Sequence, residues 1–223
     1  MTEAREKGVI IEFDFAAMDG AGLLYRTAEA LLGEIGVPFG MRVEAQHFVG
    51  SYYQGAFSEY FAAVKSKKTA AKAAKDLSDR FREALNTEVP KAVNADFTAF
   101  VRRLLEKGVK VVVSTRADVD LVREAFAPLA SEGVVLYQES SPTYGCLKWD
   151  AWRQTCVTNK LRSMFTVAVT GSGYGVKSAL VAGLGAVAVM NDHVAWQDYG
   201  GADDIVQGLD AKSADAVLDA LRI

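Results

Sequence analysis

The sequence has little that would indicate secretion, a membrane or nucleic acid. Only two of its 223 residues are cysteine, so we expect no disulfide framework, and a reducing cytoplasm fits this usage. No apolar run approaches the roughly 20 residues that cross a bilayer, and the polar first residues, MTEAREKG, do not resemble a signal peptide. The net charge of −3 gives no electrostatic reason to expect a nucleic-acid partner. These features predict a soluble, cytoplasmic protein.

Histidine is equally scarce. His47 and His193 are too few and too far apart in the sequence to predict metal ligation. The one basic run, residues 65–75, is rich in alanine, and we interpret it as a solvated helix face rather than an anion-binding or membrane-binding patch. Cys146 and Cys156 have no histidine pattern beside them and are predicted to be small buried side chains.

The hydrophobic pattern divides the chain into two parts. Residues 9–15 form a short apolar run that predicts a buried strand, whereas residues 20–92 contain helical patterns and no strand pattern. From residue 93 onward strands and helices alternate, which is typical of a parallel sheet covered on both faces. We therefore predict an α/β fold: a Rossmann-like core of residues 1–19 plus 93–223 with an inserted α-helical cap, residues 20–92. The insertion would lie above the carboxyl ends of the strands, where such sheets bind ligands.

Polar residues end three of the predicted core strands. They are Asp14, Ser114 and the turn Thr170-Gly171-Ser172. A carboxylate at the end of a buried apolar strand is costly unless it is functional or well hydrogen-bonded. These strand ends are therefore the predicted site.

These residues resemble motifs of the haloacid-dehalogenase superfamily, in the branch with a helical cap after the first strand, such as β-phosphoglucomutase and phosphoglycolate phosphatase. That family begins with FD-x-D-G-T-L, and this chain has FDFAAMD from Phe13, so Asp14 matches the nucleophilic aspartate and Ala16 replaces the acid/base. The second motif matches VVVST, with Ser114 at the phosphate-binding position. Lys148 precedes Gly171 by a spacing that the family uses. The stretch VTGSGYGVKSALVAGLG matches the fourth motif, but Thr170 and Gly171 replace its metal-holding acids.

The resemblance implies a hydrolase of the phosphatase type. Asp14 would attack phosphorus, and Lys148 would supply a cation to the transferred group. Phosphate or substrate would be bound by Ser114, Thr115, Ser172 and His47. The family's cofactor is Mg²⁺, for which Asp14 and the carbonyl of Ala16 would form a weak site. The implied partner is a small phosphorylated molecule or an inorganic anion, bound by a monomer or a homodimer.

Two hypotheses about function remain open. The first is an impaired hydrolase that keeps Asp14 as its nucleophile. The second is an inactive scaffold that binds an anion, a metabolite or a protein, because the second acid and the metal acids are missing.

The roles of four further features also stay open at this stage. Glu12 either acts on Asp14 or marks a partly open strand edge, and Asp192 is either a substitute acid or solvated. His47 either contacts substrate or packs between cap and core. The turn GSGYG, residues 171–175, resembles an anion cradle at a helix N-terminus, but a short glycine-rich turn is a weak signal.

Overall fold

The computed structural model describes residues 7–138 and 148–223, and Cys146 lies outside them. Its strands form one six-stranded parallel sheet in the order β3-β2-β1-β4-β5-β6. The strands are β1 (Gly8–Glu12), β2 (Lys110–Thr115), β3 (Val135–Gln138), β4 (Thr166–Thr170), β5 (Gly185–Val189) and β6 (Asp204–Val206). The predicted Rossmann-like parallel sheet is thus confirmed.

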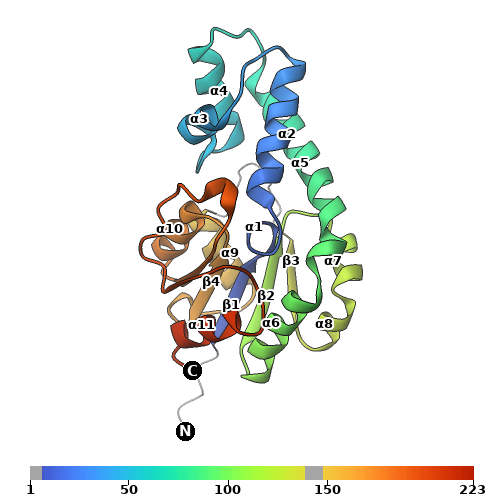
Figure 1. Cartoon of the computed structure of the whole chain (residues 1–223), viewed down its shortest axis with the longest axis vertical. Helices are drawn as coiled ribbons and strands as arrows, with labels where there is room; N and C mark the ends of the chain where they lie inside the picture. Colours follow the sequence, from blue (N-terminus) through green and yellow to red (C-terminus); the bar gives the residue numbers. More distant parts are fainter. Residues whose placement is uncertain (1–6, 139–147) are drawn as a thin grey trace.

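Helices surround this sheet and extend beyond one end of it (Figure 1). The first half of the chain forms α1 (Phe13–Ala16), α2 (Gly20–Glu34), α3 (Met41–Val43), the π-helical turn η1 (Glu44–Phe48), α4 (Tyr53–Ala63) and α5 (Ala70–Ala92). The second half forms α6 (Ala95–Glu106), α7 (Val119–Ala125), α8 (Ala127–Ser131), α9 (Trp149–Thr158), η2 (Ser163–Phe165), α10 (Gly173–Val181), η3 (Asp192–Val194) and α11 (Ser213–Ala220). Among the described residues, no helix is both long enough and apolar enough to cross a membrane.

Side-chain alternation along the strands builds a core on each face of the sheet. In β1, Val9 and Ile11 pack with residues from α5, α6, α7 and α11 on one face, while Ile10 packs with residues from α9 and α10 on the other. This period of two is the expected geometry of a strand buried on both faces. Trp152 of α9 is fully buried in the second cluster, where its indole N–H donates to Ser178 Oγ at 2.9 Å. Cys156 is buried in the same cluster.

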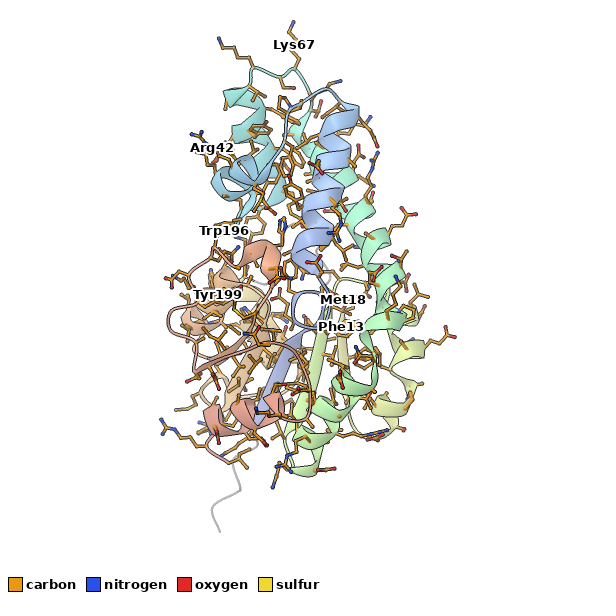
Figure 2. The ribbon with its side chains drawn as sticks, viewed as in Figure 1. Phe13, Met18, Arg42, Lys67, Trp196 and Tyr199 are labelled. Carbon is orange, nitrogen blue, oxygen red and sulfur yellow. The ribbon has the colours of Figure 1, made fainter. Side chains whose placement is uncertain are left out.

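The helices beyond the strand ends have a hydrophobic core of their own. It joins α2, η1, α4 and the first half of α5, and we call these elements, with α3, the cap. Helix α5 links the two parts, because Leu77 packs in the cap while Phe81 and Leu85 pack against the sheet. Most of the basic run faces solvent, as predicted, but it is only partly helical: residues 65–69 form the loop between α4 and α5, and the helix begins at Ala70. Figure 2 shows Lys67 at the outer tip of the cap.

The first strand is shorter than predicted. The apolar run suggested a strand through Phe15, but β1 ends at Glu12 and the chain turns at once into the short helix α1. This turn places the Phe13 ring edge-on against Phe97 and Phe126, with ring centroids 5.4 and 5.1 Å away. Such aromatic contacts stabilise a fold beyond the area that they bury.

Candidate functional site

Asp14 and the end of β2 meet at the carboxyl edge of the sheet. Strands β1 and β2 are adjacent and parallel, and Glu12 lies opposite Ser114 in their register. Asp14 therefore lies beside Ser114 and Thr115, as the strand-end pattern predicted. The Asp14 side chain is fully buried, with none of its surface exposed.

Both carboxylate oxygens of Asp14 accept hydrogen bonds from the chain itself. Thr115 Oγ1 donates to Oδ1 at 2.5 Å. Arg116 donates to Oδ2 twice, from its backbone N–H and from Nε, each at 2.8 Å. Each carboxylate oxygen of Asp14 therefore already accepts at least one hydrogen bond from a neighbouring residue.

Arg116 is the centre of a buried charge cluster. Its Nη2 lies 3.3 Å from Glu12 Oε1, and its side chain is only 1% exposed. Glu12 also accepts a hydrogen bond from the hydroxyl of Thr170. Glu12 is therefore a buried member of the charge cluster around Arg116. The guanidinium carbon lies 4.9 Å from the centroid of the Phe15 ring. Burial disfavours the charge of Arg116, but Asp14 and then Glu12 outweigh it and raise the pKa of the guanidinium above its ordinary value.

The residues at this edge do not fit a magnesium ion. The ion requires near-octahedral oxygen ligands at about 2.0–2.1 Å, whereas a guanidinium nitrogen lies 2.8 Å from Asp14 Oδ2. At Gly171 an added Cβ would lie 1.8 Å from the backbone oxygen of Phe15, so an acid at this position would collide with α1. Within residues 7–138 and 148–223, no group of three or more His, Cys, Asp or Glu side chains is arranged to hold a metal.

The predicted phosphate-binding groups are not all directed at a common point. Ser114 Oγ is buried and has no hydrogen-bond partner among the described residues. Ser172 caps α10, since its Oγ accepts from the Gly175 N–H at 2.9 Å. In the same turn the Tyr174 N–H donates to Gln197 Oε1 at 3.1 Å. Two amides of the predicted anion cradle are thus used by the protein itself.

Lys148 points toward the cap. Its Nζ donates to the Gly50 carbonyl oxygen at 2.5 Å and lies 4.4 Å from the centroid of the Tyr52 ring. The ring of Tyr174, from the core, lies 5.5 Å away. The lysine therefore joins α9 and α10 of the core to the loop that precedes α4 of the cap.

The histidines and Asp192 also have definite positions. The ring of His47 packs against the ring of Tyr60 within the cap, with 5.3 Å between the ring centroids. Its Nδ1 is buried and has no hydrogen-bond partner among the described residues. His193 contacts Glu44, with 3.0 Å between Nε2 and Oε2. Asp192 is exposed, in agreement with the solvated alternative.

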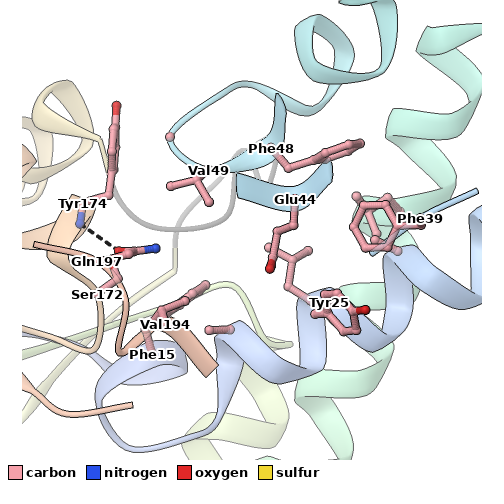
Figure 3. A pocket seen from close by; sticks show the side chains of 15 residues that line it. Phe15, Tyr25, Phe39, Glu44, Phe48, Val49, Ser172, Tyr174, Val194 and Gln197 are labelled. Carbon is pink, nitrogen blue, oxygen red and sulfur yellow. Dashed lines mark hydrogen bonds between the residues drawn. The ribbon is translucent and has the colours of Figure 1, made fainter. Parts of the chain in front are cut away.

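A small cavity, partly open to solvent, lies between cap and core (Figure 3). Phe15 belongs both to its wall and to the Arg116 cluster. The remaining lining is mainly apolar or aromatic: Ala21, Leu24, Tyr25, Ala28, Phe39, Phe48, Val49, Gly50, Leu77 and Val194. The polar or charged members of the lining are Glu44, Ser172, Tyr174 and Gln197. This composition, apolar and aromatic with a few polar groups, is typical of small-molecule sites.

The sequence interpretation missed two residues that dominate these sites, Arg116 and Glu44. Arg116 directly follows the Ser114-Thr115 pair, and two acids at the end of a buried strand require a nearby cation. That requirement could have identified it. Glu44 lies in a cap segment whose packing no short sequence pattern predicts.

Comparisons with solved structures place this fold among known ones. β-Phosphoglucomutase from Clostridium difficile superimposes with a TM-score of 0.69 at 10% identity, covering 97% of each chain. The CbbY protein of Rhodobacter sphaeroides, solved in complex with phosphate, has a TM-score of 0.67 at 15% identity over 98% of this chain and 100% of that one. A haloacid dehalogenase-like hydrolase from Streptococcus pneumoniae has a TM-score of 0.60 at 16% identity over 96% and 97%.

No family model matches the sequence, and no curated protein matches it. The structural likeness therefore establishes the fold: that of the haloacid-dehalogenase-like phosphatases with a cap domain.

Proposed function

We propose that this protein is a haloacid-dehalogenase-like protein that does not transfer phosphoryl groups at Asp14 and instead binds a small molecule between its cap and its core. In this proposal residues 20–92 are the cap, and residues 1–19 with 93–223 are the core. The observation that carries the proposal is the ion pair between the guanidinium of Arg116 and the carboxylate of Asp14, the expected nucleophile.

The chemistry of the aspartyl nucleophile supports this proposal. Nucleophilic catalysis needs a carboxylate oxygen that can approach the substrate. At Asp14 one oxygen is held by Thr115 and the other by Arg116, and the side chain is fully buried. Ala16 occupies the position of the second acid, so no carboxylate there can protonate a leaving group.

The cap–core cavity supports the binding half of the proposal. It lies where ligands bind in such folds, above the carboxyl ends of the strands. Its walls come from both parts of the molecule, with Tyr25 and Phe48 from the cap and Phe15, Ser172 and Gln197 from the core.

A phosphatase assay with p-nitrophenyl phosphate and Mg²⁺ tests the loss of chemistry. We expect the wild-type protein to release no more nitrophenol than Asp14→Asn, because Asp14 is not available to attack. Increasing Mg²⁺ should leave the melting temperature of both proteins equally unchanged, since a cation already compensates Asp14. Mg²⁺-dependent turnover that Asp14→Asn abolishes would overturn the proposal.

A further inference from the structure

The cap–core cavity contains a buried carboxylate whose second oxygen is not used by the protein. Glu44 is only 6% exposed. Its Oε2 lies 3.0 Å from His193 Nε2, whereas its Oε1 has no hydrogen-bond partner among the described residues. Figure 3 shows the Glu44 carboxylate directed from η1 into the cavity. A buried carboxylate is costly unless a donor or a positive charge satisfies it.

Aromatic rings from the cap surround the same region. Tyr25, Phe39 and Phe48 all line the cavity, with ring centroids 5.4 Å apart for Tyr25 and Phe39 and 5.5 Å apart for Phe39 and Phe48. Aromatic faces attract organic cations through the ring quadrupole, and cages of such rings recognise ammonium groups. In this wall they stand beside the Glu44 carboxylate.

The described lining of the cavity offers no cationic side chain to an anion. Among residues 7–138 and 148–223, it contains no lysine, arginine or histidine, and Glu44 is its charged member. The amides of Tyr174 and Gly175, at the N-terminus of α10, are occupied by Gln197 and Ser172. A phosphate group would thus meet a carboxylate and an apolar wall.

We infer that the cavity binds a small organic ammonium with an apolar or aromatic body, its cationic nitrogen against Glu44 Oε1 and its apolar part against the aromatic wall. This inference rests on the proposed function, since it names the ligand class of that binding site. His193 holds the Glu44 carboxylate from outside the lining and leaves Oε1 for the ligand.

Three probes of the same shape and different charge test this inference. 2-Phenylethylamine, 2-phenylethanol and phenylacetate are titrated into the wild-type protein near neutral pH by calorimetry and by thermal shift. We expect the amine to bind and to raise the melting temperature, and the other two to bind at least about tenfold more weakly, because only the amine compensates the carboxylate. This comparison needs no variant to fold.

Two variants locate the binding. Glu44→Gln can still accept from His193, and it should weaken amine binding by about tenfold or more. Glu59→Gln is the matched control, because Glu59 is an exposed carboxylate of the same cap outside the cavity. It should leave amine affinity unchanged.

The outcomes separate this inference from the proposed function. Equal binding of the three probes, preferred binding of phenylacetate, no amine binding, or amine binding unaffected by Glu44→Gln would overturn the ammonium assignment. None of these results involves phosphoryl transfer, which the nitrophenol assay measures independently.

Discussion

Replacing Arg116 by methionine should destabilise the protein more than any loss of a surface ion pair. The substitution keeps much of the side-chain volume and removes the charge that faces Asp14 at 2.8 Å and Glu12 at 3.3 Å. Removing one partner of a buried ion pair typically costs about 3–5 kcal/mol, because the other charge remains buried without compensation. Here two carboxylates would remain, so we expect a loss at or above the upper end of that range.

The same substitution predicts a distinct dependence on pH and on neighbouring residues. Protonation of the two carboxyl groups that Arg116 no longer compensates would relieve their repulsion. The loss of folding stability should therefore become smaller at acidic pH. The combined variant Glu12→Gln, Asp14→Asn and Arg116→Met removes all three charges and should recover part of the stability.

Urea unfolding at neutral pH measures the free energy of unfolding of each variant. For a chain of this length, 3–5 kcal/mol corresponds to a decrease in melting temperature of about 6–20 °C. Arg80→Met is the control: Arg80 pairs with Glu34 at 2.7 Å, but the side chains are 41% and 55% exposed. Such exposed pairs contribute about 0–1 kcal/mol. Equal losses for Arg116→Met and Arg80→Met would refute the assignment of a buried charge cluster.

Two further predictions concern the cap. Lys148→Met removes the donor to the Gly50 carbonyl. In hydrogen exchange, the amides of Val49 and Ser51 should then exchange faster with solvent, while the amides of β1 should not change. Unchanged exchange at Val49 and Ser51 would show that Lys148 does not hold this loop. Burial raises the pKa of Glu44 above 4.5, with His193 opposing. At pH values between the ordinary and the raised pKa of Glu44, the folded protein keeps a proton that the unfolded chain has released. The contribution of Glu44 to folding stability therefore falls as the pH rises. Glu44→Gln should therefore gain stability relative to the wild type as the pH rises above 4.5 in urea unfolding. A difference that does not change with pH would contradict this origin of the shift.

The fold was largely predictable because its signals are periodic and local. The helix-only stretch at 20–92 follows from spacing along the chain and corresponds to the observed helices α2 to α5. The end of β1 was not predictable from periodicity. Phe15 continues the apolar run, but packing of Phe13 against two rings of other elements turns the chain after Glu12.

The site was predictable only in part, for a related reason. Parallel strands bring their carboxyl ends to one edge, so the proximity of Asp14, Ser114 and Thr115 follows from the topology. The spacing of Lys148 gives its place in the chain, but the direction of its side chain depends on the Gly50 carbonyl and the ring of Tyr52, which belong to the cap. Arg116 lies directly after Thr115, outside the positions that match the family's motifs, so a comparison of motif positions does not find it.

The charge balance of the strand end links the missing acids to the proposed change of function. Two buried carboxylates, Glu12 and Asp14, need a positive charge, and the family resemblance implied Mg²⁺ in that place. Arg116 supplies the charge from within the chain, and in our proposal it thereby takes up the oxygen that nucleophilic attack requires. Phe15 contacts this cluster and also lines the neighbouring cavity, in which we infer a ligand beside Glu44. Binding at Glu44 therefore requires no opening of the Arg116 cluster, and the two sites can be tested by separate substitutions.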